Sequence, residues 1–254
     1  SITGSSSGIG RATAIECARH GARLVLHHIG DEQSRQDIKT LQHIISSDRS
    51  EVQTSGQRAV EIALDIRDVD AGQRLVDKAI CSFGKLDSIV HNAGICQFSD
   101  FMAVTQEQQE RHMAINYTAA FRITQSVVEH MISQGKGGSV VNIASVTATA
   151  GSSQLVHYAA SKAALLGMTV SSAVALGKYG IRVNAVSPGT IETAMNRDDL
   201  SGAKKSVMEQ RVPLGRLGKP DDVARAVVFF VSSLSEYVSG QNLIVDGAAT
   251  ISYQ

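Results

Sequence analysis

Short apolar runs alternate with longer stretches of helical apolar spacing along almost the whole chain. The short runs predict strands at residues 23–28, 59–64, 86–91, 138–144, 181–187 and 242–246. The longer stretches predict helices at residues 11–20, 31–47, 69–83, 105–134, 157–179, 198–210 and 220–233. Strands that alternate with helices in this way are usually parallel. We therefore expect a single α/β domain over residues 1–254, a doubly wound parallel sheet with helices on both faces.

A glycine-rich turn precedes the first predicted helix. Gly4, Gly8 and Gly10 remove side chains where the backbone must turn tightly, and the helix that starts near Ile9 presents unpaired N–H groups. With Ser7 inside the turn and a strand after the helix, this order is typical of a Rossmann-type dinucleotide site. A flexible terminus rich in serine and glycine is the alternative interpretation.

Tyr158 and Lys162 are one helical turn apart, thirteen residues after Ser145. Residues at this spacing share one face of a helix, so the ammonium group is expected close to the phenol. A free phenol has a pKa of about 10, and a neighbouring cation lowers that pKa, which makes proton abstraction from an alcohol feasible. An isolated Tyr-x-x-x-Lys is more often a packed aromatic beside a solvated charge, so the pair needs support from other motifs.

Composition excludes several other classes of protein. Lys and Arg together number 24 and so do Asp and Glu, which leaves no basic surface for nucleic acid or for an acidic membrane. No stretch approaches the roughly 18 uninterrupted apolar residues of a membrane span. Cys17, Cys81 and Cys96 form no Cys-x-x-Cys pair and the histidines are dispersed, so we expect no metal site and a reducing, cytoplasmic compartment.

Seven short motifs occur in a fixed order along the chain. They are Thr3-Gly4-x-x-x-Gly8-Ile9-Gly10, Asp65, Asn92-Ala93-Gly94, Asn116, Ser145, Tyr158-x-x-x-Lys162 and Pro188-Gly189. Over essentially its whole length the chain resembles the short-chain dehydrogenase/reductase family. The resemblance implies an NAD- or NADP-dependent oxidoreductase with one catalytic domain and a substrate lid at about residues 191–211.

The resemblance also implies a role for each catalytic residue. Ser145 would hydrogen-bond the reacting oxygen, and Tyr158 would act as the general base as hydride leaves for nicotinamide. Lys162 would hold the nicotinamide ribose and lower the pKa of the tyrosine. Asn116 would hold a water molecule that links Lys162 to bulk solvent.

Further contacts with the cofactor follow from the same resemblance. Asp65 and Ile66 would meet the adenine, while Asn92, Ala93 and Gly94 would let the backbone lie against the cofactor. The nicotinamide end would be bound by Pro188, Gly189, Ile191 and Thr193.

The choice between NAD and NADP depends on the end of the second family strand. Members selective for NAD carry an acidic residue there, and counting from Gly10 places that position near His28, with no acidic side chain before Asp31. Members selective for NADP often carry a basic residue there or at the position of Ser7. Our hypothesis is that His27 or His28 tolerates a 2′-phosphate, giving NADP preference or dual use.

Finer resemblance concerns the substrate. The runs 175–185, 188–196 and 211–216 are similar to family members that oxidise L-rhamnose at its anomeric carbon. A polyol needs several hydrogen-bond partners, which Ser145, Thr147, Gln154, Tyr158 and Asn196 could provide, with Ser152 and Ser153 nearby.

Two alternatives stay open. One is a 3-oxoacyl-thioester reductase, which would use a basic patch for a carrier protein, with Arg122, Arg197, Lys204 and Lys205 as candidates. The other is a nucleotide-binding protein without catalysis. In either case apolar residues on more than one face of helices 105–134 and 157–179 predict a homodimer or homotetramer.

Overall fold

The computed structural model describes residues 1–47, 57–196, 200 and 202–252. Its strands are β1 (Leu24–His28), β2 (Ala59–Ala63), β3 (Ser88–His91), β4 (Gly138–Ile143), β5 (Ile181–Pro188) and β6 (Asn242–Val245). Every strand pairing is parallel, with β1 beside β2 and with β3, β4, β5 and β6 in sequence. Ile2 joins the two groups, because it bridges both Leu26 of β1 and Val90 of β3.

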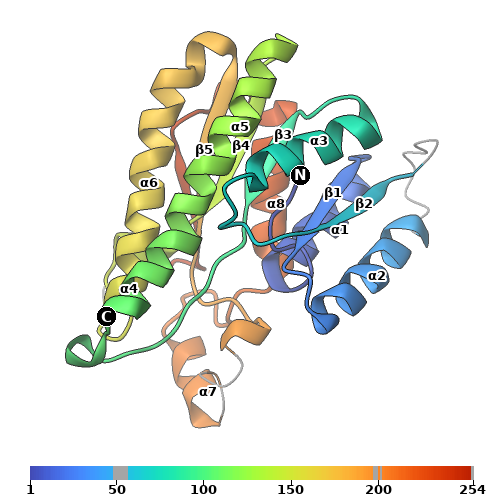
Figure 1. The fold of residues 1–254 in the computed structure, drawn as a ribbon. Helices are drawn as coiled ribbons and strands as arrows, with labels where there is room; N and C mark the ends of the chain where they lie inside the picture. Colours follow the sequence, from blue (N-terminus) through green and yellow to red (C-terminus); the bar gives the residue numbers. More distant parts are fainter. Residues whose placement is uncertain (48–56, 197–199, 201, 253–254) are drawn as a thin grey trace.

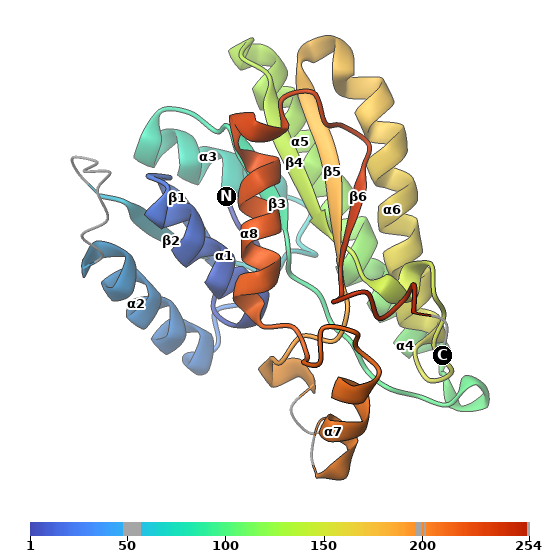
Figure 2. The same ribbon diagram turned by 180° about the vertical axis from the view of Figure 1, so that it is seen from behind.

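Helices cover both faces of this sheet, as the sequence predicted (Figure 1). The helices α1 (Gly8–Arg19), α2 (Glu32–Ser47) and α8 (Pro220–Val231) pack on one face, which Figure 2 shows from behind. The other face carries α3 (Ala71–Phe83), α5 (Ala119–Gln134) and α6 (Val156–Leu176). Two shorter helices, α4 (Gln106–Met113) and α7 (Ala203–Gln210), complete the regular helices of the described chain.

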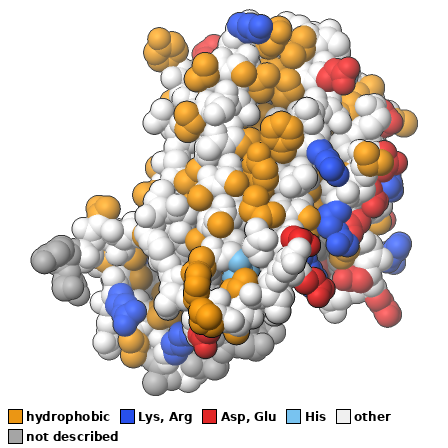
Figure 3. Space-filling model, turned by 60° about the vertical axis from the view of Figure 1, so that its left-hand side comes forward, with side chains coloured by type: hydrophobic (Ala, Val, Ile, Leu, Met, Phe, Trp, Pro, Cys, Tyr) orange, Lys and Arg blue, Asp and Glu red, His pale blue; other side chains and the backbone are white. Residues whose placement is uncertain are grey.

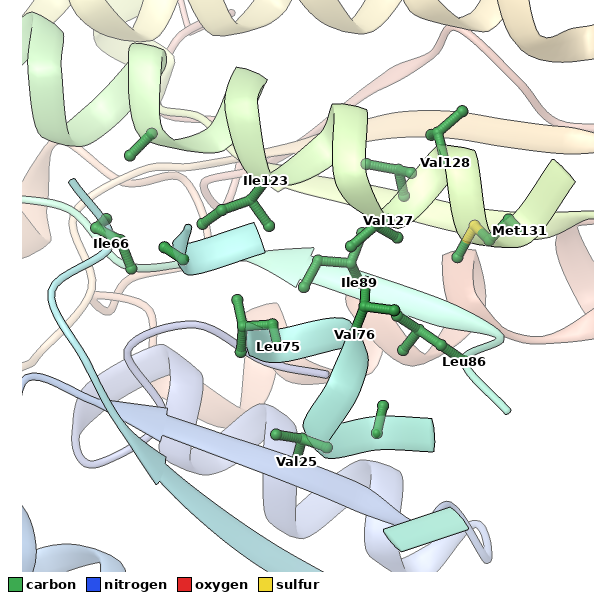
Figure 4. Close-up of a cluster of buried hydrophobic side chains, with 14 of the residues drawn as sticks. Val25, Ile66, Leu75, Val76, Leu86, Ile89, Ile123, Val127, Val128 and Met131 are labelled. Carbon is green, nitrogen blue, oxygen red and sulfur yellow. The ribbon is translucent and has the colours of Figure 1, made fainter. Parts of the chain in front are cut away.

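Each face of the sheet has its own hydrophobic core. Figure 4 shows the core under α3 and α5, where Val25 of β1 and Ile89 of β3 meet Leu75 and Val127. Leu24 and Leu26 point the other way and pack in the core under α1, α2 and α8. Because both faces are covered, the strands are mostly apolar, which is the pattern that the sequence analysis used.

The predicted helix at 105–134 is interrupted by a π-helical segment. α4 ends at Met113, five residues from Ala114 to Thr118 are π-helical, and α5 begins at Ala119. Such segments are rare and are frequent at functional sites, and this one contains Asn116. The predicted helix 157–179 corresponds to α6 followed by a 3-10 turn, Gly177–Tyr179. Of the predicted helix 198–210, residues 198, 199 and 201 lie outside the described residues.

One helical stretch, Val156–Tyr179, is long and apolar enough to cross a membrane by length and composition alone. Its polar side chains nevertheless bind the sheet. Lys162 donates to the backbone oxygen of Ile143, and Thr169 accepts a hydrogen bond from Asn142 of β4. These contacts are those of a core helix within the domain.

Candidate active site

The predicted motifs meet at the carboxyl edge of the sheet. The glycine turn follows Ile2, Asn92 follows β3, Ser145 follows β4, and Pro188 ends β5. In parallel sheets these strand ends lie together, which is where open α/β folds bind their ligands.

Ser145 and Tyr158 form the centre of the site. Ser145 caps a 3-10 turn, and its Oγ accepts hydrogen bonds from the backbone N–H of Thr147 at 3.2 Å and from Thr147 Oγ1 at 2.9 Å. Tyr158 lies in the first turn of α6, close enough for the Ser145 hydroxyl to lower the pKa of the phenol. Because Thr147 donates to Ser145, the proton of Ser145 is directed toward the tyrosine and any oxygen bound beside it.

Burial controls the ionisation of Tyr158. It raises the pKa of the phenol, the nearby thiol of Cys96 raises that pKa further, and the hydrogen bond with Ser145 opposes both. The sequence predicted that Lys162 would lower this pKa. In the structure Lys162 Nζ lies 5.8 Å from the centre of the Tyr158 ring, and it is Ser145 that opposes the effect of burial.

Lys162 is held on the sheet side of the site. Its side chain is buried, and Nζ donates to the backbone oxygen of Ile143 at 2.7 Å. Burial lowers the pKa of Lys162 to about 8, so the amine remains largely protonated at neutral pH. A Cβ on Gly94 would lie 3.5 Å from this Nζ and 3.0 Å from Asn116 Oδ1, so only glycine leaves the lysine and the asparagine in place.

Asn116 fastens the loop after β3 to α6. Its Oδ1 accepts from the backbone N–H of Ile95 at 2.9 Å, while Nδ2 donates to the Ile95 oxygen and to Ser161 Oγ, each at 3.0 Å. These contacts make Asn116 a positioning residue. The water molecule that the family resemblance assigns to it stays a prediction.

The glycine turn is tied to the loop after β3. Asn92 Nδ2 donates to the oxygens of Thr3 and Gly4, at 3.0 and 2.9 Å, and Thr3 Oγ1 accepts from the N–H groups of Asn92 and Ala93. A Cβ on Gly4 would come within 2.9 Å of the Ala93 backbone, and Gly4 has a positive φ of 63°. These contacts pack the turn too closely for any side chain at Gly4.

Gly8 faces space instead of packed backbone. The nearest atom to a Cβ placed there would be Cγ2 of Thr193, 3.4 Å away, and a pocket of about 680 Å³ extends from this point. The pocket is lined by the turn, by the start of the lid and by α7 and α8, including Ser6, Ser7, Gly8, Thr193, Ala194 and Lys205. Small side chains and N–H groups at the start of α1 fit a dinucleotide diphosphate, while Lys205 is paired with Glu192 at the rim.

His27 is not available to a cofactor. Its Nδ1 accepts from the backbone N–H of Gly4 at 2.9 Å, and Nε2 hydrogen-bonds the Leu64 oxygen at 3.0 Å, so both ring nitrogens are used. Burial lowers the pKa of His27 to about 4, which keeps the ring neutral. Of the two histidines that were predicted to tolerate a 2′-phosphate, His27 thus has both ring nitrogens bound within the protein. His28 remains, with Nδ1 3.1 Å from Ser34 Oγ and a buried Nε2.

Several predicted contact residues are occupied by protein partners. The Asp65 carboxylate is bound by Arg67, whose hydrogen bonds lower its pKa, and Ile66 is buried beside it. Gly189 packs against Asp246, where a Cβ would lie 2.7 Å from Asp246 Cβ.

The start of the lid is held by one side chain. Asn196 Oδ1 accepts from the N–H and the hydroxyl of Thr193, both at 3.1 Å, and Nδ2 donates to the Ile191 oxygen at 2.7 Å. Across the site, Gln154 Nε2 donates to Asp100 at 2.9 Å. Gln154 and Asn196, both predicted to bind substrate, thus also shape the loops around it.

Three residues near the tyrosine were not predicted. Cys96 is close enough to raise the pKa values of Tyr158 and Lys162. His112 and His157 are buried edge to face, with ring centres 4.4 Å apart, and the centre of His112 lies 6.5 Å from that of Tyr158. In the sequence, the only signal for Cys96 is its position two residues after Gly94, and the only signal for His157 is its position directly before Tyr158.

Comparisons with known proteins identify the family. A family model described as "Enoyl-(Acyl carrier protein) reductase" matches residues 4–250. An L-rhamnose 1-dehydrogenase (NAD(P)(+)) from Azotobacter vinelandii is 42% identical over 254 residues, covering 100% of this chain and 96% of that protein. A 3-oxoacyl-[acyl-carrier-protein] reductase from Thermotoga maritima is 36% identical, covering 98% of this chain and 96% of the relative.

The fold of a solved structure supports the same family. A short-chain type dehydrogenase/reductase from Mycobacterium marinum has a TM-score of 0.87 at 29% identity, covering 99% of this chain and 95% of that one. Sequence and structure together show that this chain belongs to the short-chain dehydrogenase/reductase family.

Proposed function

We propose that the protein is an NAD(P)-dependent dehydrogenase that oxidises L-rhamnose, or an aldose of similar configuration, at the anomeric carbon to give a lactone. The observation that carries the proposal is the placement of Tyr158 beside buried Lys162, with Nζ 5.8 Å from the centre of the phenol ring, at the sheet edge where Ser145 and the glycine turn lie. The substrate is supported by the relative from Azotobacter vinelandii, which is 42% identical along the entire chain.

The side chains suit this reaction. Nicotinamide, when bound, accepts the hydride from the anomeric carbon. Tyr158 takes the proton of the anomeric hydroxyl, and Ser145, oriented by Thr147, donates a hydrogen bond to the same oxygen. Lys162 places a positive charge 5.8 Å from the phenol ring, which favours the phenolate as the proton leaves.

The site can also recognise a sugar. Thr147, Gln154 and Asn196 bring hydroxyl and amide groups from three different segments, and a hydrogen-bonding site rejects analogues that lack the matching hydroxyls. We assign these three residues, with Ser145 and Tyr158, to the substrate. The lid would close over it.

A panel of aldoses tests the proposal. With NAD and with NADP, L-rhamnose, L-lyxose and L-mannose should be oxidised rapidly, because they share configuration near the reacting carbon. D-Glucose and simple secondary alcohols serve as controls. Equal rates on all of these compounds would leave only the family assignment, and no turnover with any of them would favour a nucleotide-binding protein without catalysis.

The alternative enzyme is the 3-oxoacyl-thioester reductase, supported by the relative from Thermotoga maritima. Its proposed basic patch has few candidates: Lys205 pairs with Glu192 and Glu209, and Lys204 lies over the Phe98 ring. Arg197 lies outside the described residues. Oxidation of NADPH with acetoacetyl thioester, without activity on L-rhamnose, would select the reductase.

We also propose a homodimer or homotetramer. The face over α5 and α6, seen in Figure 3, carries many hydrophobic side chains. Among them Phe121, Val170 and Val174 are 42%, 55% and 81% exposed. Light scattering at micromolar concentration should give a mass well above the 26.9 kDa of one chain. A reducing compartment remains a prediction, made from the number and the spacing of the three cysteines.

A further inference from the structure

The helix that carries Tyr158 begins without a capping side chain. The residue before α6 is Leu155, whose side chain cannot accept a hydrogen bond from the first N–H groups of the helix. α4 begins differently, because Thr105 and Gln108 form a complete capping box. The start of α4 is therefore fixed by its own residues, whereas the start of α6 depends on contacts with other elements.

His112, in the last turn of α4, supplies such a contact, since α4 lies beside the start of α6 (Figure 1). The His112 ring meets the His157 ring edge to face, with centres 4.4 Å apart, and the Tyr158 ring in the same manner at 6.5 Å. Nδ1 of His112 lies 2.7 Å from the Gln108 oxygen, and because a carbonyl oxygen only accepts, this nitrogen carries the proton. The hydrogen bond fixes the plane of the ring. The capped helix thus sets the direction from which the ring meets Tyr158.

A second link lies one turn further along both helical segments. Asn116 follows His112 by four residues, and Ser161 follows His157 by four residues. Asn116 Nδ2 donates to Ser161 Oγ at 3.0 Å, and Ser161 Oγ donates to the backbone oxygen of Tyr158 at 2.6 Å. The turn of α6 that carries Tyr158 is therefore tied to α4 on one side and to the π-helical segment on the other.

Packing alone does not explain why two histidines occupy this contact. Nε2 of His112 and both ring nitrogens of His157 are buried and have no hydrogen-bond partner within the described part of the chain. Each unpartnered nitrogen lowers stability, which an apolar side chain of the same shape would not do. Burial lowers the pKa of His112, with His157 and Arg111 acting in the same direction, so the ring is neutral at neutral pH. Residues that lower stability beside an active site are often retained because activity needs them.

We infer that His112 is a positioning residue for Tyr158. Its ring, held by the Gln108 oxygen, fixes the first turn of α6 and so aligns the phenol with the reacting oxygen. The hydroxyl of Ser145 and the charge of Lys162 favour the phenolate only while the phenol keeps this alignment. The inference rests on the proposed function, because it takes Tyr158 as the base.

Three variants separate the ring from its nitrogens and from the loss of any buried histidine. His112→Phe keeps an aromatic ring without the donor to Gln108, and His112→Leu removes the ring. His130→Leu is the matched control, because His130 lies in α5 and its Nε2 is also buried without a partner in the described structure. Oxidation of L-rhamnose over a range of pH gives kcat and KM. Calorimetry gives the Kd for nucleotide, and thermal unfolding gives Tm.

His112→Leu should lower kcat about 10- to 100-fold, because small displacements of the base slow proton transfer. KM and the Kd for nucleotide should change less than about twofold, since the variant loses no binding contact. The pH at which kcat is half-maximal should rise, because the phenol is no longer aligned with Ser145 and Lys162. Tm should be unchanged or higher, because an unpartnered nitrogen has been removed. His112→Phe should recover part of kcat, and His130→Leu should change neither kcat nor its pH dependence.

Unchanged kcat in His112→Leu, or a lower Tm with parallel losses of kcat and nucleotide affinity, would overturn the positioning role and leave the dehydrogenase assignment intact. A wild-type protein that reduced only acetoacetyl thioester would refute the proposed substrate, and the ratio of kcat values on that reaction would still test His112. If the wild-type protein bound nucleotide but turned over neither substrate, the proposed function and the inference would fall together.

Discussion

The catalytic wall and the lid are built by different means. We call Asn116, Ser145, Tyr158 and Lys162 the catalytic wall; Asn116 and Lys162 are at most 5% exposed, and both bond backbone groups of other segments. The described part of residues 191–211, the predicted lid, is held by contacts within the segment, such as that from Asn196 to Ile191, and by the bridge of Ile191 to Gly218. The wall is therefore held by buried contacts between distant segments, whereas the predicted lid combines contacts between near neighbours with a bridge at its start.

Removing the phenol of the wall gives the largest expected effect. Tyr158→Phe should lower kcat by about 10²- to 10⁴-fold, because a positioned acid or base contributes that much. The Kd for nucleotide, measured by calorimetry, should stay within about twofold, since Lys162 is bonded to Ile143 and does not depend on the hydroxyl. Tyr179→Phe, at an exposed position, is the matched control. Full activity in Tyr158→Phe would refute the mechanism.

Crowding the wall should have the next largest effect. Gly94→Ala places a Cβ 3.0 Å from Asn116 Oδ1 and 3.5 Å from Lys162 Nζ. Small displacements of a catalytic group slow the reaction strongly, so kcat should fall roughly 10- to 100-fold. Gly177→Ala is the control, because a Cβ there meets nothing within 4 Å. Equal activity of the two variants would mean that the wall is more adaptable than its packing indicates.

The wall was predictable from sequence because motifs that follow parallel strands must meet at one edge. That rule and the spacing of a helical turn place Ser145, Tyr158 and Lys162 together, while their roles were predicted from the family resemblance. The π-helical segment around Asn116 was not predictable, since it leaves the apolar spacing of residues 105–134 almost unchanged. The contacts of the lid depend on short turns, for which the sequence carries no periodic signal.

The two neighbouring histidines of β1 show a second limit. Counting from the glycine turn located the end of the strand correctly, near His28. Successive residues of a strand face opposite sides, so only one of the two rings can face a given side. Counting could not tell which, and in the structure His27 meets Gly4 while His28 points toward Ser34.

Acid should destabilise the fold through two buried histidines, His27 and His91. Burial lowers the pKa of His27 to about 4 and that of His91 to about 3, whereas an unfolded histidine has a pKa of about 6.5. The folded state therefore stays neutral while the unfolded state takes up protons below pH 6.5. The contribution of these two histidines to the free energy of unfolding should be level above that pH. Toward pH 4 it should fall by about 1.4 kcal/mol per pH unit for each histidine.

Denaturant unfolding at a series of pH values measures this slope. His91→Asn should reduce the slope by the contribution of one histidine, because asparagine does not titrate. The fold should be retained, because the amide can still donate to Thr124, the partner of His91 at 2.8 Å. An unchanged slope in that variant would show that other groups cause the acid loss.

The smallest expected effect comes from removing a contact of the predicted lid, between Lys204 and Phe98. Lys204 of α7 lies with Nζ 5.7 Å from the centre of the Phe98 ring, in the loop after β3, so this contact joins the lid to the wall side of the site. At exposed positions such a cation–π contact is worth about 0.5–1 kcal/mol. Lys204→Gln and Phe98→Leu, alone and combined, should therefore show a coupling of that size in kcat/KM for the sugar. Tyr158 chemistry is untouched by either change, so the single-turnover rate at saturating sugar should stay constant. Additive effects of the two substitutions would show that the lid takes its position without this contact.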